Sequence, residues 1–501
     1  MLNKIVELSL RYKVLVLVAF VLVIFMGVRA WQKVPLDAFP DVTPVQVNIY
    51  TEAPGLAAED VEKLLTFPVE TAMAGLPGIE HIRSVSLFGL SYVSVYFKDN
   101  VDIYFARRLA SEKLQEAKAR IPQGYGEPVL GANSSGLGQV FWYTIEATDM
   151  KLSQMDLRAL QDWNVRLVLR TAPGVDDVMS WGGQEKQYQV LINPQKLIKY
   201  GLSFKSVMEV LTANNRQVGG QFVNLGREQY LVRGLGLVAN TQDIGSIVVD
   251  ERSGTPIYVR DVAEVKEAPA LRTGAITKDG KEVVLGMALA RTGENAQTVV
   301  EAVKKKLELI KQSLPDGVNI KQVYDRTELI GKAIAMADRA MVEGALLVVV
   351  VLFLFLGEVR SALIVVVAIP MARLIAFIFM DEYGVSANLM SLGGLIVGLG
   401  MTIDGPVVLV ENAYRLLSHH AGKAVNRTQV VLEAAREVMN PIAFGVLIII
   451  VVFLPLFALT GLEGKLFKPL ALNMTFAMIG SMILTLTLIP VLAALGLRAK
   501  Q

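Results

Sequence analysis

Apolar residues are unevenly distributed along the chain. One apolar tract covers residues 14–28, and further tracts follow one another from about residue 341 to the end. Between them, residues 32–335 mix polar and apolar positions as an ordinary water-soluble protein does. A helix needs about 20 mainly apolar residues to cross the hydrocarbon core of a bilayer. The pattern therefore predicts a membrane protein with a large domain outside the membrane.

Six membrane-spanning helices are predicted. The first tract reaches full length with Tyr12, Lys13 and Trp31 as interfacial flanks, and its exit lacks a signal-peptide cleavage site, so we interpret it as an uncleaved anchor. The second, residues 345–356, is short, and we expect it to continue the amphipathic residues 333–344 as one helix that rises from water into lipid. The other predicted spans are residues 362–380, 389–410, 441–459 and 470–497.

The basic residues predict the orientation of these spans. If both termini are inside, the short inner segments hold ten lysines and arginines, and the short outer loops hold only Lys465 and Lys468. Basic residues accumulate on the cytoplasmic side of membrane proteins. We therefore expect both termini in the cytoplasm and residues 32–335 outside it, which in a bacterium with two membranes is the periplasm. The predicted divisions are residues 1–33, a periplasmic part at 34–335, and a second membrane part at 336–501.

The periplasmic part has the element order of a repeated α/β unit. Residues 44–130 predict a strand, a helix, a hairpin, a helix and a short strand, which is the β-α-β-β-α-β order of a ferredoxin-like fold. A similar cycle begins at residue 141, with strands expected at 175–181 and 187–192. The pair Gly219-Gly220 and the strand-like residues after it predict a small insertion at about 220–260. The expected fold class is a helical membrane bundle with ferredoxin-like periplasmic subdomains and this insertion.

Composition excludes several classes of function. The chain has 49 basic and 47 acidic residues, and a net charge of +2 gives no reason to expect a nucleic acid partner. With no cysteine, it cannot have a disulfide, a thiolate nucleophile or a cysteine-ligated metal. The periplasmic sequence has no nucleophile motif, phosphate-binding loop or cluster of metal ligands. We therefore expect a protein that is not an enzyme and has no cofactor.

Two carboxylates in the fourth predicted span are the main candidates for function. An ionised Asp404 in the middle of a membrane helix would cost at least ~2.5–3.5 kcal/mol, so it should bind a proton, meet a partner or face a wet cavity. Glu411 follows seven residues later, close to two turns, so both side chains project from nearly the same face. The pair suits cyclic protonation. The alternative is that Asp404 makes a structural hydrogen bond and Glu411 is merely interfacial.

Other residues also disturb the apolar pattern. Arg373, in the middle of the third span, could pair with Asp404, extend towards the interface, or indicate a shorter span. Pro406 cannot donate to the carbonyl of Thr402 and is expected to kink the helix. The glycines at 393, 394, 398, 400 and 405 are expected to let a neighbouring helix pack closely.

Single histidines and methionines are weak signals. His419 and His420 fall in a predicted cytoplasmic loop and are expected to be solvated. Most of the 18 methionines lie in apolar spans, where packing explains them. Met390, near the outer end of the fourth span, is a candidate soft metal contact on a substrate path.

Several motifs together resemble the heavy-metal efflux branch of the resistance-nodulation-division (RND) superfamily. The resemblance covers essentially the whole chain, and the motifs are far more specific together than singly. They are Val34-Pro-Leu-Asp-Ala-Phe-Pro-Asp41, Val45-Gln-Val47, Leu160-Gln-Asp-Trp163, Tyr188-Gln-Val-Leu-Ile192, Tyr324-Asp-Arg326, Val359-Arg-Ser-Ala362, Asn388-Leu-Met-Ser-Leu-Gly-Gly394 and Asp404-Gly-Pro-Val-Val-Leu-Val-Glu-Asn412.

The resemblance implies an inner-membrane antiporter that exchanges protons for heavy-metal cations and works as a trimer. Such pumps join a periplasmic adaptor protein and an outer-membrane channel. Asp404 matches the family's proton-relay aspartate, and Glu411 matches its companion glutamate. The ferredoxin-like units would be porter subdomains, and the insertion would be half of a docking domain. The metal is the substrate of such a pump.

The chain departs from the family's pattern in length and at two residues. Family members carry two such halves, so we expect either a truncated product or half-length subunits that pair. Most metal ligands would lie in the other half. Pro406 stands where alanine is usual, and Arg373 stands where an uncharged residue is usual. Both departures bear on whether this chain can transport.

The metal preference follows from a few positions. Copper and silver pumps line their path with methionines, and Met390 matches one of these. Thr402 and Leu409 stand where two others are expected. Thioethers select Cu(I) and Ag(I), so this pattern favours the divalent ions of zinc, cobalt, cadmium and nickel.

Three other functions stay open. An accessory subunit of the protein-export machinery shares the arrangement of one span followed by five, although the motif from Asp404 to Asn412 argues against it. Proton-driven efflux of multiple drugs or other organic compounds fits the same architecture. The third is an inactive half-transporter.

Overall fold

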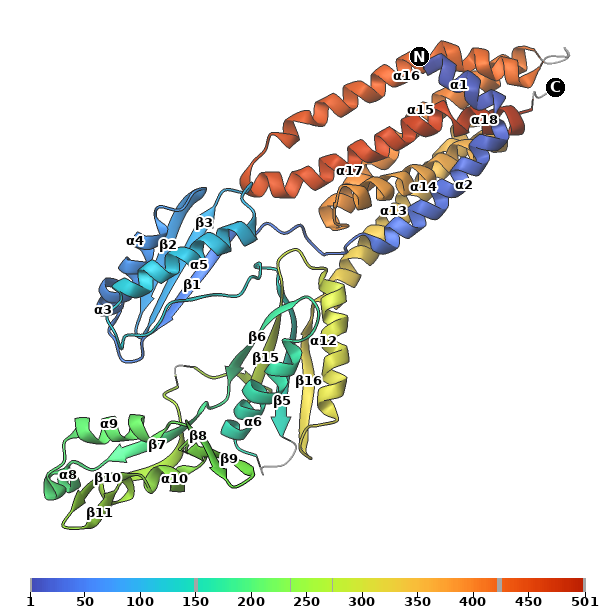
Figure 1. The fold of residues 1–501 in the computed structure, drawn as a ribbon. Coiled ribbons are helices and arrows are strands. Elements are labelled where there is room, and N and C mark those ends of the chain that lie inside the picture. Colours follow the sequence, from blue (N-terminus) through green and yellow to red (C-terminus); the bar gives the residue numbers. More distant parts are fainter. Residues whose placement is uncertain (1, 148–151, 235, 273, 421–425, 499–501) are drawn as a thin grey trace.

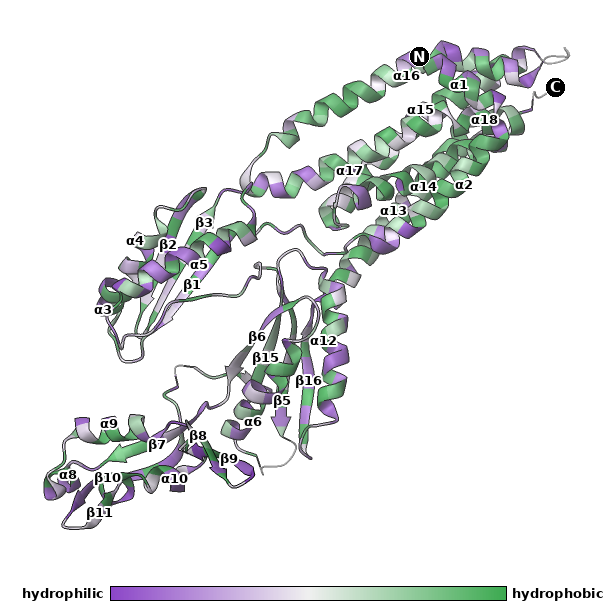
Figure 2. Cartoon of the chain, viewed as in Figure 1, coloured by the Kyte–Doolittle hydropathy of each residue, from purple (hydrophilic) through white to green (hydrophobic). Residues whose placement is uncertain are grey.

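The computed structural model describes residues 2–147, 152–234, 236–272, 274–420 and 426–498. A block of long helices lies at one end of the molecule, an α/β insertion lies at the other, and two α/β units lie between them (Figure 1). Figure 2 shows that apolar residues run along the helices of the block, whereas the α/β parts mix polar and apolar residues. The molecule is therefore divided as the hydrophobic pattern predicts.

The membrane block contains five described helices that are long and apolar enough to cross a membrane. A sixth candidate, α13 (Arg326–Leu356), does not belong to these five, so the count of six spans stays a prediction. The helix α13 is nevertheless continuous across the predicted boundary at residues 335 and 336. The five are α2 (Lys13–Lys33), α14 (Val359–Glu382), α15 (Leu389–His419), α16 (Arg427–Phe457) and α17 (Gly461–Leu486).

The bounds predicted for the last span, residues 470–497, are wrong. The helix α17 begins at Gly461 and ends at Leu486, and a separate helix, α18 (Leu488–Gly496), follows it. Pro490 has no N–H for the carbonyl of Leu486, and its ring would clash with that carbonyl in a continuous helix. The break falls at Thr487, whose φ of −124° and ψ of −69° are not helical. The N-terminal helix α1 (Leu2–Arg11) lies at the same end of the block as α18 (Figure 1).

The first α/β unit has the predicted β-α-β-β-α-β order. Its antiparallel sheet has the strand order β2-β3-β1-β4. Buried side chains of the sheet and helices form a core of their own. The elements are β1 (Val45–Glu52), α3 (Ala58–Val61), the π-helical turn η1 (Glu62–Thr66), α4 (Phe67–Met73), β2 (Ile79–Leu87), β3 (Leu90–Phe97), α5 (Ile103–Arg120) and β4 (Val129–Leu130).

The second unit repeats this topology with the strand order β16-β5-β15-β6. All seven residues of β15 are buried, and such a continuous apolar run suits an inner strand. Its core continues through α13 into the outer part of the membrane block. The elements are β5 (Gln139–Ala147), α6 (Gln154–Leu160), η2 (Gln161–Val165), α7 (Arg166–Leu169), β6 (Val175–Gly182), β15 (Val284–Ala290), α12 (Ala296–Lys311) and β16 (Val318–Asp325).

The insertion is larger than the predicted residues 220–260. The sequence places β7 (Lys186–Ile192) in the second unit, but the structure pairs it with β12 (Ala263–Pro269). The entirely buried β15 occupies the place next to β6, whereas β7 is largely exposed. The insertion therefore runs between β6 and β15 and has its own small core. It also contains α8 (Pro194–Tyr200), α9 (Phe204–Asn214), β8 (Val218–Leu225), β9 (Glu228–Gly234), α10 (Thr241–Gly245), β10 (Val248–Arg252), β11 (Thr255–Tyr258) and α11 (Val259–Val262). The short hairpin of β13 (Thr277–Lys278) and β14 (Lys281–Glu282) follows the insertion and leads back to β15 of the second unit.

Two of the sequence motifs meet where the membrane block joins the α/β units. Arg326, the first residue of α13, is 5% exposed, and its Nη2 lies 2.6 Å from Oδ1 of Asp37. The backbone N–H of Asp37 donates to the carbonyl of Ala387 at 3.0 Å, just before α15. The N–H of Ala387 donates to the carbonyl of Pro35 at 2.9 Å. The segment after α2 thus ties the starts of α13 and α15 together.

Candidate functional site in the membrane block

The two predicted carboxylates line one groove. Asp404 and Glu411 both project from α15 into a cavity of about 1010 Å³ whose walls also include residues of α13 and α14. The seven-residue spacing therefore places them on one side of the helix, as the sequence predicts. The role of these carboxylates as proton carriers stays a prediction.

Both carboxylates belong to an exposed stripe on α15. Exposed residues recur every three or four positions along this helix, which is the period of one helix face. Among the residues that the structure describes, neither Asp404 nor Glu411 has an ion pair or a hydrogen bond through its side chain. Asp404 thus has no charge partner among the described residues. The stripe consists of Val397, Gly400, Asp404, Val408, Glu411, Arg415 and His419.

The opposite face of α15 packs against α16 and α17. A Cβ at Gly394 would lie 2.5 Å from the carbonyl oxygen of Leu470, so only glycine allows this approach. A Cβ at Gly405 would lie 3.1 Å from Ile442 Cγ2 and from Thr485 Oγ1. The prediction that these glycines allow a neighbouring helix to pack closely is wrong for Gly393 and Gly400, because an added Cβ there would meet no described atom within 4 Å.

Pro406 does not end α15. The carbonyl of Thr402, four residues earlier, has no N–H from Pro406, but it accepts a hydrogen bond from Oγ of Ser481 on α17. The helix therefore continues to His419 with its freed carbonyl satisfied by a neighbouring helix. Ser481 is a residue that the sequence does not reveal, because its partner lies 79 positions away.

Arg373 pairs with Asp338 and not with Asp404. Its Nη2 lies 2.7 Å from Oδ1 of Asp338 on α13, which corrects the pairing that the sequence left open. The guanidinium carbon also lies 5.5 Å from the ring centroid of Trp31 and 5.1 Å from that of Phe377. The sequence does not single out Asp338 as a partner of Arg373, because Asp338 lies in the amphipathic part of α13, where acidic residues are common.

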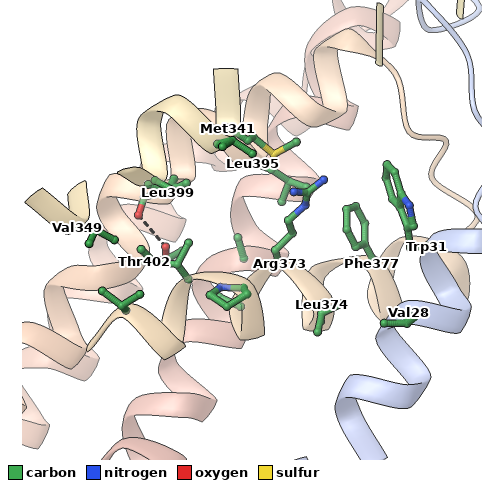
Figure 3. Close-up of a pocket in the computed structure, with 17 residues that line it drawn as sticks. Val28, Trp31, Met341, Val349, Arg373, Leu374, Phe377, Leu395, Leu399 and Thr402 are labelled. Carbon is green, nitrogen blue, oxygen red and sulfur yellow. Dashed lines mark hydrogen bonds between the residues drawn. The ribbon is translucent and has the colours of Figure 1, made fainter. Parts of the chain in front are cut away.

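Arg373 borders a second cavity, which is mainly apolar. This cavity of about 490 Å³ lies among α2, α13, α14, α15 and α17. Figure 3 shows Arg373 extending between Met341 and Phe377, with Trp31 beyond Phe377. Thr402 also lines it, so α15 presents Thr402 to this cavity and Asp404 to the groove.

The predicted metal contacts stay isolated. Met390 is half-buried in the first turn of α15 and lines neither the groove nor the cavity at Arg373. His419 is the last residue of α15 and lines the groove, whereas the sequence places it in a loop. Nδ1 of His420 lies 2.8 Å from the carbonyl oxygen of Leu416. Within the described residues, no group of three or more histidine, aspartate or glutamate side chains could hold a metal ion.

A cluster of charged residues lies in the second α/β unit, outside the membrane block. The carboxylate of Glu146 accepts hydrogen bonds from Nζ of Lys278 at 2.7 Å and from Nζ of Lys321 at 2.6 Å. Burial opposes ionisation of Glu146, but hydrogen bonds from both lysines and Thr144 outweigh it and lower the pKa to about 2. The cluster joins β5, β13 and β16, so its role is to hold this edge of the unit together.

Known proteins match the chain over nearly all of its length. The model of the AcrB/AcrD/AcrF family matches residues 5–501. The cation efflux system protein CzcA of Alcaligenes sp. (strain CT14) is 44% identical over 508 residues, which cover 99% of this chain and 48% of that protein. The cation efflux system protein CusA of Escherichia coli (strain K12) is 39% identical over 509 residues, with 100% and 48% covered.

The fold also matches a solved structure. The X-ray crystal structure of a heavy metal efflux pump (crystal form I) superposes with a TM-score of 0.87 at 34% sequence identity, covering 98% of this chain and 48% of that one. The chain therefore spans about half the length of the relatives that it matches.

Proposed function

The chain belongs to the AcrB/AcrD/AcrF family of RND transporters, and we propose that it is a membrane component of a pump that exports heavy-metal cations. The names of its relatives support this cargo, because they include a cobalt-zinc-cadmium resistance protein and a nickel-cobalt-cadmium resistance protein. We propose further that protons entering the cell drive the export. Asp404 and Glu411 would carry these protons.

The observation that carries the proposal is the groove on α15. It holds two carboxylates at membrane depth, without charge partners among the described residues. A charged carboxylate there is costly, so binding and releasing a proton changes its preferred surroundings. One proton moving down 100 mV supplies about 2.3 kcal/mol before any pH gradient is added. Cyclic protonation of Asp404 would thus be able to alternate two arrangements of the helices around it.

The proposed cargo is a divalent ion of zinc, cobalt, cadmium or nickel in preference to copper or silver. Thr402 and Leu409 provide no thioether, and Leu409 is fully buried within the bundle. Soft monovalent copper and silver prefer thioether ligands, whereas the divalent ions accept imidazole and carboxylate. The ligands of the cargo would come largely from the half of such a pump that lies outside the matched region of the relatives.

The proposed setting is the bacterial inner membrane, with both termini in the cytoplasm and the α/β units in the periplasm. The insertion and the ferredoxin-like units would meet a periplasmic adaptor protein, which joins the pump to an outer-membrane channel. The pump would be a trimer of full-length units or an assembly in which half-length chains pair.

Metal tolerance tests the proposal. We expect expression of the chain in a host without its own metal pumps to raise tolerance to zinc, cobalt or cadmium. Asp404→Asn should abolish this gain, because asparagine cannot carry a proton. Asp381→Asn is the matched control, since Asp381 also loses its charge but pairs with Lys33 at the outer end of α14. Tolerance that survives Asp404→Asn would contradict the role of Asp404 as proton carrier.

A second arm separates an inactive chain from an incomplete one. The part of CzcA from Cupriavidus metallidurans that this chain does not match can be supplied from a second plasmid. If tolerance appears only with that part, the chain works as one portion of a larger pump. If neither arm gives tolerance to any of the six metals zinc, cobalt, cadmium, nickel, copper and silver, metal efflux by this chain is wrong and the inactive half-transporter is favoured.

Efflux of organic compounds is the second candidate function. The observation that favours it is the apolar cavity bordered by Arg373, Trp31 and Phe377, because such a lining suits an organic molecule better than a hydrated metal ion. A panel of dyes and detergents in the same host distinguishes the two. Tolerance to these compounds without tolerance to metals would replace the metal proposal. The family match over residues 5–501 argues against a protein-export subunit.

A further inference from the structure

A third cavity, of about 420 Å³, lies where the first α/β unit adjoins the outer end of the membrane block. Its walls come from the segment after α2, the loop before α5, the loop between α14 and α15, and the first turns of α17. It is separate from the groove at Asp404 and from the cavity at Arg373. Its charged residues are Asp41, Asp99, Lys465 and Lys468.

Two of these four charged residues are partners of each other. Nζ of Lys465 lies 2.8 Å from Oδ1 of Asp99, and it also donates to the carbonyl oxygen of Thr43 at 2.7 Å. These contacts tie α17 to the first α/β unit. Because the charges of Lys465 and Asp99 cancel, this pair leaves little net charge for a ligand.

The other two charged residues are of opposite sign and are not paired. Lys468 is half-buried, and its ammonium group has no ion pair or hydrogen bond among the residues that the structure describes. Asp41 is exposed and has no ion pair in that part of the chain, although its Oδ1 accepts the N–H of Thr43 at 3.0 Å. Lys468 and Asp41 thus line one cavity without pairing with each other. The cavity therefore offers a ligand one cation and one separate anion.

The surroundings of the cavity favour a lipid as this ligand. Val385, Pro469 and Leu472 give it an apolar wall. The helix α16 ends at Phe457, shortly before the cavity residue Thr460, and none of the residues in its most apolar stretch is buried. An apolar helix that is exposed along its length suits contact with acyl chains. A phospholipid beside the outer end of α16 would place its headgroup at the cavity.

The two unpaired charges match a phosphoethanolamine headgroup. This group has an anionic phosphate and a primary ammonium, joined by a short linker. The ammonium of Lys468 suits the phosphate as a compact point charge. The carboxylate of Asp41 suits the primary ammonium, which donates charge-assisted hydrogen bonds. A phosphocholine headgroup has no N–H to donate, and a phosphoglycerol headgroup has no cation for Asp41.

We propose that this cavity binds a phospholipid with a phosphoethanolamine headgroup, with Lys468 on the phosphate and Asp41 on the ammonium. The bound headgroup connects the segment after α2 to the start of α17, and so supports the joint between the first α/β unit and the membrane block. The site goes beyond the proposed function, because its occupancy requires neither a proton nor a metal ion.

Native mass spectrometry of the detergent-solubilised full chain measures the binding. Phosphatidylethanolamine, phosphatidylcholine and phosphatidylglycerol with identical acyl chains are titrated separately, and the apparent Kd of the first bound lipid is compared. We expect phosphatidylethanolamine to bind roughly tenfold more tightly than the other two, because only its headgroup donates hydrogen bonds from a cation to Asp41.

Substitutions locate the site. Lys468→Gln should weaken the binding of phosphatidylethanolamine roughly tenfold, and Lys468→Arg should restore most of it. Asp41→Asn keeps an oxygen for the N–H of Thr43 but should remove most of the preference for phosphatidylethanolamine. The matched controls are Lys33→Gln and Asp381→Asn, because these two residues pair with each other at the outer end of the block and do not line the cavity.

Equal affinity of the wild-type chain for the three lipids would overturn the proposal, and this result does not depend on the folding of any variant. A loss in the control variants equal to that in Lys468→Gln would overturn the site. Soluble phosphoethanolamine is the last arm. If it displaces phosphatidylethanolamine at equal concentration, the cavity binds the free headgroup and not a lipid. Metal tolerance is not measured in these experiments, so failure of this site and failure of the proposed function are distinguishable.

Discussion

Pro406 stands inside α15 without ending it, because the carbonyl that it deprives of an N–H finds another donor. Within a membrane, water is not at hand to satisfy such a carbonyl, so a neighbouring helix has to do so. Oγ of Ser481 on α17 fills this role for Thr402. The hydroxyl and the proline, 75 positions apart, therefore depend on each other for the stability of the helix that carries Asp404.

We expect Ser481→Ala to destabilise the protein by about 1–3 kcal/mol, the cost of leaving a buried acceptor unsatisfied. The midpoint of denaturant unfolding in detergent micelles measures this. Thr475→Ala is the control, because Oγ1 of Thr475 donates within its own helix to the carbonyl of Ala471 at 2.8 Å.

A double-mutant cycle identifies the cause. In a Pro406→Ala background, the restored N–H can donate to Thr402, so Ser481→Ala should cost less than about 0.5 kcal/mol. An equal cost in both backgrounds would show that the hydroxyl acts elsewhere.

Glu146 couples the stability of the second α/β unit to pH. Folding lowers its pKa from the ordinary 4.5 to about 2, so its stabilisation is fully present above pH 4.5 and is lost as the pH falls towards 2. We expect Glu146→Gln to weaken the pairing of β5 and β16 at pH 7 by roughly 1.5–3 kcal/mol. Amide hydrogen exchange of these strands, compared with wild type at each pH, measures this.

Hydrogen exchange measured near pH 2 checks whether the charge of Glu146 causes this effect. The difference between Glu146→Gln and wild type should shrink as the pH approaches 2, since the wild-type carboxylate is then protonated as well. Glu308→Gln is the control, because Glu308 forms an exposed pair with Lys311 and such pairs contribute little. A difference that persists at low pH would mean that packing, and not charge, explains the loss.

At the scale of elements, the insertion behaves as a separate unit joined at one point. The N–H of Ala270 donates to the carbonyl of Glu185 at 2.8 Å, so the two ends of the β7 and β12 pair lie side by side. The second unit has its sheet and core outside this segment. Its strands β6 and β15 pair directly, with Gly182 opposite Val284.

We therefore expect replacement of residues 186–269 by an Asn-Gly turn to leave the second unit folded. Hydrogen exchange of β5, β15 and β16 in the detergent-solubilised protein should match that of the full chain. The Asn-Gly turn is needed in this variant, because removal of residues 186–269 without it would leave two separate chains. Loss of protection in all three strands would show that the insertion is part of the unit's fold.

One helix connects the parts of the molecule. α13 begins at the half-buried Asp37–Arg326 pair, holds Asp338 opposite Arg373, and ends with the apolar residues that line the groove with Asp404. A change in the packing of α13 on α15 therefore reaches the second α/β unit along a continuous helix. The start of α15 is tied to the same joint through Ala387.

At the scale of the whole molecule, we propose that another chain covers the exposed stripe of α15. Carboxylates are costly against lipid, so Asp404 and Glu411 favour a protein or water neighbour. Pairing of chains would bring two such stripes together. We expect Val397→Cys, on this stripe and 55% exposed, to give dimers with a short bismaleimide in native membranes. Gel electrophoresis under denaturing conditions detects them.

Leu447→Cys, on the exposed face of α16 and 54% exposed, is the matched control and should stay monomeric. If both cysteines give dimers to the same extent, random collision explains them. If neither does, the stripe is not where two copies meet.

The sequence by itself determined the division into a membrane block and α/β parts, the topology of the first unit, and the placement of Asp404 and Glu411 on one face. These features depend on local periodicity, either 3.6 residues for a helix or two for a strand. The family motifs added the expectation of metal efflux. Local pattern also predicted the continuity of α13.

The tertiary structure decided the rest, because it depends on pairing between distant residues. Arg373 forms an ion pair with Asp338 and not with Asp404, and the carbonyl of Thr402 accepts a hydrogen bond from the hydroxyl of Ser481. The buried β15 displaced β7 from the second unit, which moved the limits of the insertion. His419 became a groove residue only when α15 proved longer than its apolar tract. Hydropathy reports how a residue meets solvent on average, whereas the neighbour that it meets is settled by packing.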